Sequence, residues 1–204
     1  MLVWLARHND KTARQIQLGL GILIALNELV WYGYVLQRDW VSFPYGLPLN
    51  LCDVALWLTV VAIWTQKPVV FELAYFWGLA GSSMALLTPD LGASLTLYPA
   101  VQFFAAHGGV VVALLFVTWR GLAQPRIHSW LRAFVMLNCY AAAIALFNVI
   151  FNTNYFYLCE KPSSASLLDY MGPWPIYIIV GEVLALGIFA LLYLPFRNRI
   201  QHLK

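Results

Sequence analysis

Charged residues are scarce in this chain. Asp, Glu, Lys and Arg make up 10% of its 204 residues, whereas 62% of the residues are hydrophobic. Because about a quarter of the residues of a soluble domain are charged, this composition excludes an ordinary soluble domain. The chain also lacks the alternating segments of about ten residues that are typical of a membrane β-barrel. These two absences leave a helical protein that crosses a membrane several times.

Several sequence motifs are missing as well. The chain has no HxxxxD spacing, no P-loop, no CxxC pair and no HExxH motif, which removes several enzyme classes that depend on them. The short apolar stretch LVWLA near the start is followed by basic residues and not by a small-residue cleavage site, so we expect no separate signal peptide. We also expect no cofactor, no metal site and no nucleic-acid partner.

Six apolar segments approach the length of about 20 residues that a spanning helix needs. They cover residues 16–36, 47–64, 69–87, 101–119, 131–151 and 174–196. Proline and polar residues such as TQKP and GLAQPR mark the gaps between them. We therefore predict an all-α polytopic membrane protein, a bundle of six transmembrane helices that forms one domain over residues 1–204.

The basic residues give this bundle an orientation. Arg38 and Lys161 fall in loops on one predicted side, and the other ten basic residues fall on the opposite side. These ten are Arg7, Lys11, Arg14, Lys67, Arg120, Arg126, Arg132, Arg197, Arg199 and Lys204. Since Lys and Arg are enriched in cytoplasmic loops, the pattern predicts that both termini are cytoplasmic.

Polar side chains interrupt the apolar spans, and most of them fall in the predicted outer half. They are Glu28, Cys52, Asp53, His107, Asn148 and Glu182. An ionised acid near the centre of a span costs about 2.5–3.5 kcal/mol, and the outer halves of the spans contain no Lys or Arg. We therefore expect a polar cavity that opens outward and is lined by both Glu28 and Glu182. Glu72 lies near the cytoplasmic end of its span, where snorkelling explains it.

Cys52 and His107 suggest nucleophilic chemistry. A thiol reacts as a thiolate and needs a base, and His107 is the histidine on the outer side. A Cys–His pair is the minimum machinery for acyl transfer through a thioester, and Asp53, Asp90 or Asp169 could orient the imidazole. Simpler interpretations remain open: Cys52 could be a packing residue or form a disulfide with Cys159, His107 could be interfacial, and the acids could bond to neighbouring groups.

Four motifs carry a resemblance to a known family. They are LPLNLCDVALWL, FELAYFWGLAGSSMALLTPDL, FFAAHGGVV and SLLDYMGPWPIYI. With these motifs the chain resembles the YwaF-like family of small bacterial membrane proteins, whose animal relative is an acyltransferase that remodels ether phospholipids. The resemblance implies a catalytic pair at Cys52 and His107 and a bacterial plasma membrane location. Family members often read LPLHLC, and this chain has Asn50 in place of that histidine.

The resulting hypothesis is a lipid acyltransferase or transacylase. His107 would deprotonate Cys52, which would take an acyl chain from a membrane phospholipid and pass it to a lysophospholipid or another acceptor. The alternative is a carrier or ligand-binding membrane protein that uses the buried acids Glu28, Asp53 and Glu182 without covalent chemistry. A structural or assembly role is a third possibility. The sequence does not indicate the acyl donor, the acceptor or the oligomeric state.

Overall fold

The computed structural model describes residues 10–89, 97–162 and 166–201, and these residues form helices joined by loops. No β-strand occurs in these ranges apart from an isolated bridge between Ser42 and Tyr45. The helices of the first half are α2 (Asp10–Leu36), α3 (Leu51–Thr65), α4 (Pro68–Leu73), the π-helical segment η1 (Ala74–Gly78) and α5 (Leu79–Leu87). Those of the second half are α6 (Leu97–Trp119), α7 (Ser129–Phe151), the short 3-10 segments η2 (Tyr155–Tyr157) and η3 (Leu167–Met171), and α8 (Ile176–Gln201).

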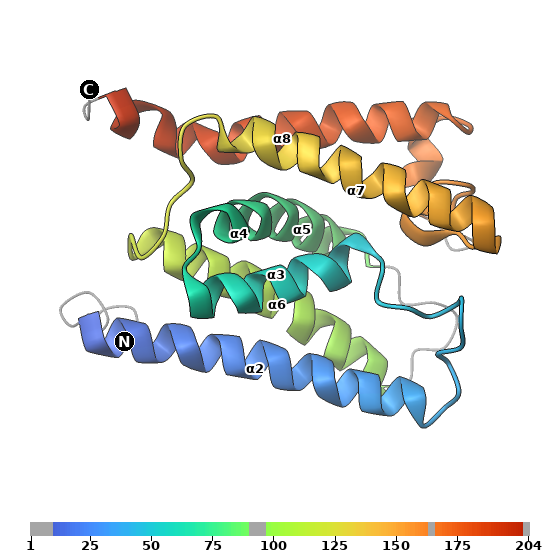
Figure 1. Cartoon of the computed structure of the whole chain (residues 1–204), viewed down its shortest axis with the longest axis horizontal. Helices are drawn as coiled ribbons and strands as arrows, with labels where there is room; N and C mark the ends of the chain where they lie inside the picture. Colours follow the sequence, from blue (N-terminus) through green and yellow to red (C-terminus); the bar gives the residue numbers. More distant parts are fainter. Residues whose placement is uncertain (1–9, 90–96, 163–165, 202–204) are drawn as a thin grey trace.

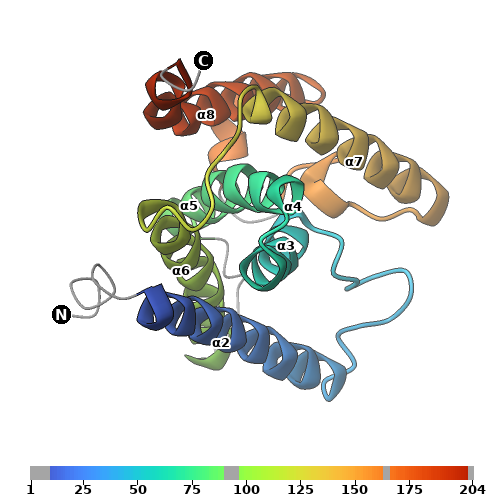
Figure 2. The same cartoon turned by 60° about the vertical axis from the view of Figure 1, so that its left-hand side comes forward.

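The helices form two groups (Figure 1). In the first group α2 packs against α3 and α6, and α5 packs against α6. In the second group α7 and α8 pair with each other and reach the first group through α4, η1 and α5. Figure 2 shows the α7–α8 pair on the opposite side of the bundle from α2. The central core between the two groups is apolar and contains Phe71, Phe76 and Phe189, all buried.

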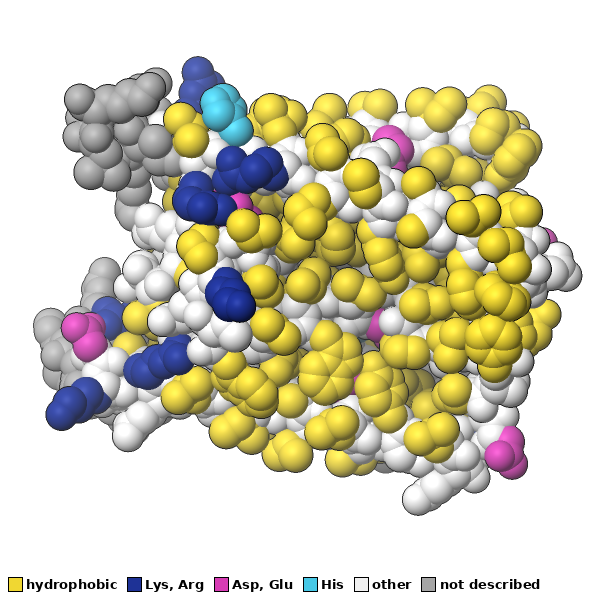
Figure 3. All heavy atoms as spheres, in the orientation of Figure 1, with side chains coloured by type: hydrophobic (Ala, Val, Ile, Leu, Met, Phe, Trp, Pro, Cys, Tyr) yellow, Lys and Arg dark blue, Asp and Glu magenta, His cyan; other side chains and the backbone are white. Residues whose placement is uncertain are grey.

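The prediction of a wholly helical membrane protein is confirmed for the described residues. Five helices are long and apolar enough to cross a membrane: residues 10–36, 68–87, 98–119, 129–151 and 176–197. The helix at Leu51–Thr65 is apolar but shorter. The start of α2 and the end of α8 lie at the same end of the bundle (Figure 1). The Lys and Arg side chains visible in Figure 3 gather at that end, while hydrophobic side chains cover the middle.

Helix α3 begins four residues later than the predicted segment 47–64 and ends one residue beyond it, and polar groups fix both of its ends. At its start the Asp53 carboxylate accepts a hydrogen bond from the Asn50 N–H at 3.1 Å, which is one half of a capping box. At its end the carbonyl of Ile63 accepts hydrogen bonds from Arg14 and Gln17 of α2, both at 2.9 Å. These bonds satisfy backbone groups that a helix terminus would otherwise leave unpaired inside a membrane.

The π-helical segment η1 attaches the α7–α8 pair to the core. Its five residues are all buried. Tyr75 donates a hydrogen bond to the Leu192 carbonyl of α8 at 3.1 Å, and the Trp77 indole donates one to the Ala133 carbonyl of α7 at 3.0 Å. The extra residue of a π-turn widens the helix, and here the widened turn presents two aromatic donors to two neighbouring helices.

Glu72 corrects one interpretation of the sequence. Snorkelling would leave its carboxylate at the surface, but the residue is only 2% exposed. The carboxylate accepts hydrogen bonds from the Arg126 guanidinium at 2.7 and 3.1 Å and from Arg132 at 3.1 Å. These bonds also raise the pKa of the Arg126 guanidinium. Glu72 is therefore a buried acid that ties α4 to the loop before α7 and to α7 itself.

Candidate active site

Cys52 and His107 line the same cavity, although they come from different helices. The cavity has a volume of about 170 Å³ and lies between α2, α3, α5 and α6. Its lining consists of Glu28, Trp31, Cys52, Asp53, Leu56, Ser82, Gln102, Phe103, Ala106, His107 and Val110. We call it the inner cavity. The Cys52 side chain is accessible and His107 is buried, so a small group inside the cavity meets both a thiol and an imidazole.

The protonation of His107 follows from its hydrogen bond. Its Nδ1 lies 2.9 Å from the Phe103 carbonyl oxygen, one turn earlier in α6. Because a carbonyl oxygen only accepts, Nδ1 must carry the proton, and the neutral ring then has an unprotonated Nε2. The Phe103 ring also packs on the imidazole, with centroids 4.2 Å apart. No hydrogen bond joins His107 to Cys52 within the described residues, as is common for catalytic pairs without substrate.

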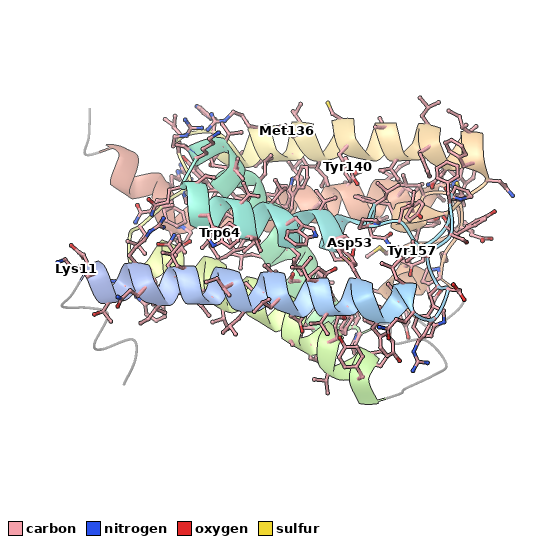
Figure 4. The ribbon with its side chains drawn as sticks, turned by 60° about the horizontal axis from the view of Figure 1, so that its bottom comes forward. Lys11, Asp53, Trp64, Met136, Tyr140 and Tyr157 are labelled. Atoms are coloured by element: carbon pink, nitrogen blue, oxygen red, sulfur yellow. The ribbon has the colours of Figure 1, made fainter. Side chains whose placement is uncertain are left out.

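Asp53 has a structural role, because it caps the start of helix α3. Its carboxylate binds the Asn50 backbone N–H, and the Asn50 side-chain oxygen accepts a hydrogen bond from the Phe156 N–H at 3.3 Å. Asn50 therefore connects the start of α3 to η2. In Figure 4 Asp53 lies at the start of α3, alongside α2. It lines the inner cavity as well, but its hydrogen bond goes to Asn50 and not to His107.

Glu28 lines the inner cavity, and it has a partner that sequence reasoning missed. The Gln102 amide donates a hydrogen bond to the Glu28 carboxyl at 3.2 Å, and both residues are buried. Ser82 was missed too, although it is buried and lines the same cavity. The sequence contains the same signal for Gln102 and Ser82. Each is a polar residue inside an otherwise apolar span, and such residues mark functional positions in membrane helices.

A second cavity adjoins the first. It measures about 430 Å³ and shares Trp31 and Asp53 with the inner cavity. Its wall comes from the outer part of α2, the loop before α3 and the segment after α7, and much of it is aromatic, with Trp40, Tyr45 and Tyr155 among its members. We call it the outer cavity. Asn50 lies in its wall, so the two cavities meet at the start of α3.

Two predicted cavity residues lie elsewhere. Glu182 accepts a hydrogen bond from Asn138 of α7 at 2.9 Å, because α8 pairs with α7 on the far side of the bundle from α2 (Figure 2). Asn148 closes the turn after α7 through bonds to Thr153 and to the backbone of Tyr155. The expectation that Glu28 and Glu182 share a cavity is therefore wrong for Glu182, and Asn148 has a structural role.

Asp169 does not orient His107 in the described structure. Asp169 is exposed and accepts a hydrogen bond from the Ser166 N–H at 2.8 Å in η3. Asp90 lies outside the described residues. No group of three His, Cys, Asp or Glu side chains that could hold a metal ion occurs in the described ranges. Cys52, Cys139 and Cys159 are free thiols, so the alternative of a bridge between Cys52 and Cys159 is not formed here.

The fold and the cavities define a class of protein: a polytopic helical membrane protein that holds a thiol and an imidazole in one cavity. The sequence model of the TMEM164 family matches residues 1–193. The chain belongs to the TMEM164 family. A protein of Treponema pallidum (strain Nichols), described as an uncharacterized protein, is 31% identical over 185 residues, which cover 88% of this chain and 73% of the relative. No solved structure matches the chain.

Proposed function

We propose that this protein is a membrane-embedded lipid acyltransferase or transacylase that works through an acyl-thioester on Cys52. One observation carries the proposal: Cys52 and His107 line a single cavity, and the hydrogen bond to Phe103 leaves Nε2 of His107 free to accept a proton. Nucleophile and base in one enclosed site are the requirement for thioester chemistry. Family membership and the motif resemblance to YwaF-like proteins, whose animal relative transfers acyl chains, agree with it.

The reaction begins when Nε2 of His107 takes the thiol proton. The sulfur attacks the carbonyl carbon of a phospholipid ester, and the glycerol oxygen leaves with the proton that His107 returns. In the second half of the reaction His107 takes the proton of a lysophospholipid hydroxyl, and the hydroxyl oxygen attacks the thioester carbon. The sulfur of Cys52 leaves and takes the proton back from His107. The outer cavity, which meets the inner one at Trp31 and Asp53, provides room for the polar end of each lipid.

The direct test is to trap the thioester. Purified protein in vesicles of phosphatidylcholine that carries a labelled acyl chain should retain label on Cys52, and hydroxylamine should release it because thioesters react with it readily. Cys139→Ala and Cys159→Ala serve as matched controls, since both cysteines are exposed and lie outside the inner cavity. The assignment would be contradicted if the Cys52→Ala protein kept the labelled acyl chain while the Cys139→Ala or the Cys159→Ala protein lost it.

We also propose that both termini are cytoplasmic in a bacterial plasma membrane, so that the end of the bundle where α2 begins and α8 ends faces the cytoplasm. The clustering of basic side chains at that end supports this orientation (Figure 3). Reporter fusions after Lys204 and inside residues 88–100 should report opposite sides of the membrane. A cytoplasmic signal from residues 88–100 would reverse the orientation, and the inner cavity would then open toward the cytoplasm.

The alternative function is a carrier that handles protons or cations with its buried acids. Glu28 and Asp53 do line the inner cavity, which favours this candidate, whereas Glu182 lies apart from them. A carrier responds to pH or ion gradients across proteoliposomes and keeps that response in Cys52→Ala. An acyltransferase loses its activity in the same variant.

A further inference from the structure

Ser82 of α5 carries a hydroxyl group that has no hydrogen-bond partner in the described part of the chain. The residue is 3% exposed and lines the inner cavity, and its hydroxyl makes no hydrogen bond to any described residue. Two buried or half-buried helical hydroxyls differ from it: Thr59 and Thr118 each donate to the carbonyl four residues earlier at 2.7 Å. Ser129 at the start of α7 resembles Ser82, since its buried hydroxyl has no partner among the described residues. Because Ser82 lines the inner cavity and no described group uses its hydroxyl, this hydroxyl is available as a donor to an acceptor inside the cavity.

The packing of α5 places Ser82 between the helices of the nucleophile and the base. A Cβ atom at Gly78 would lie 2.8 Å from Leu114 and 3.0 Å from Val110 of α6. Gly78 is the last residue of η1, which continues directly into α5, and Ser82 lies one turn further along the same helical face. Helix α6 runs in the opposite direction (Figure 1). Ser82 therefore comes opposite the turn of α6 before Val110, which contains His107.

The residue before Ser82 in α5, Gly81, faces α3. A Cβ atom at Gly81 would lie 3.9 Å from Leu51, and Leu51 immediately precedes Cys52 in the first turn of α3. Ser82 therefore lies between His107, the proposed base, and α3, the helix that carries Cys52. A group that reacts with Cys52 inside the inner cavity is enclosed by all three side chains.

We propose that Ser82 is a catalytic residue whose hydroxyl donates a hydrogen bond to the oxyanion of the tetrahedral intermediate. The inference rests on the proposed acyl transfer at Cys52. As the sulfur bonds to the ester carbon, the thiol proton passes to His107 and the electron pair of the C=O bond moves onto oxygen. Ser82 stabilises that oxygen without losing its own proton. When the electron pair on the oxyanion forms the C=O bond again, the bond between the carbonyl carbon and the glycerol oxygen breaks. The glycerol oxygen then takes the proton from His107.

The test separates acylation of Cys52 from its simple reactivity. With 4-nitrophenyl laurate in detergent micelles as the probe, Ser82→Ala and Ser82→Gly should slow the burst of nitrophenolate by about 10²–10³-fold, the usual loss for one oxyanion donor. Alkylation of Cys52 by iodoacetamide should keep its wild-type rate in both variants, because that reaction forms no oxyanion. Ser83→Ala is the matched control: it removes a neighbouring hydroxyl outside the cavity lining and should leave both rates unchanged.

Two outcomes would overturn the proposal. A burst within about twofold of wild type in Ser82→Ala would show that the hydroxyl is not needed. Equal losses of acylation and alkylation would show that Ser82 only maintains the shape of the site. Cys52→Ala distinguishes these from a failure of the proposed function: a normal burst in that variant refutes the thioester itself, whereas a silent Cys52→Ala with an active Ser82→Ala refutes the role of Ser82 alone.

Discussion

Cys52→Ala should lower acyl transfer by at least about 10³-fold, as loss of a nucleophile does in other enzymes that form covalent intermediates. The side chain is accessible and lines the cavity, so alanine removes the sulfur with little loss of packing. Cys52→Ser should also be much weaker than wild type, because an alcohol is hardly ionised near neutral pH. The measurement is transfer of a labelled acyl chain from phosphatidylcholine to a lysophospholipid in proteoliposomes.

His107→Ala should be about as damaging, and the double variant should be little worse than either single variant, because the two residues act as a unit. Cys139→Ala is the matched control and should retain full transfer. Near-normal turnover in Cys52→Ala would leave the cysteine as a packing residue. Strictly multiplicative losses in the double variant would mean that thiol and imidazole act in separate steps.

Glu72→Ala should lower the free energy of unfolding by about 3 kcal/mol, because removal of one partner from a buried ion pair costs about 3–5 kcal/mol. The Arg126 and Arg132 side chains are 49% and 46% exposed, so water can reach them after the change, which puts the effect at the lower end. The variant also loses the acceptor for the Arg126 backbone N–H, which now bonds to Glu72 at 3.1 Å. Thermal unfolding of the purified protein in detergent measures the loss.

The matched control for Glu72 is the other acid that pairs with an arginine in the described residues. Asp10 accepts a hydrogen bond from Arg120 at 3.2 Å, and its side chain is 97% exposed. An exposed pair contributes little to stability, so Asp10→Asn should leave the unfolding temperature nearly unchanged. Equal stability of Glu72→Ala and wild type would show that α7 is held to α4 by apolar contacts and not by this cluster.

The helices were predictable because their signal is local. Each apolar segment of the sequence corresponds to a helix or, for 69–87, to the succession α4, η1 and α5. The π-turn at Ala74–Gly78 had no signal in composition, since AYFWG is compatible with an ordinary α-helix. The late start of α3 also depends on distant groups: the Leu47 N–H bonds to the Tyr155 hydroxyl at 2.8 Å, which the sequence around Leu47 does not reveal.

The site was only partly predictable, because pairing between helices is not written in one stretch of sequence. Depth along the spans was enough to single out Cys52, His107 and Glu28, which the structure brings to one cavity. The prediction that Glu182 shares a cavity with Glu28 was wrong, because it used their equal depth in the membrane, and depth does not say which helices are neighbours. Glu72 was misjudged for a similar reason: its arginine partners are far away in the sequence.

The short length of α3 has a consequence for how a lipid would reach Cys52. Fifteen residues span about 22 Å, roughly 8 Å less than the hydrocarbon core of a bilayer. The helix ends beside exposed Lys67 at the basic end of the bundle, so the missing length falls at the end that carries Cys52. The thiol would then lie at the boundary between headgroups and acyl chains, where the ester bonds of a phospholipid are found. A donor would enter sideways without leaving its leaflet.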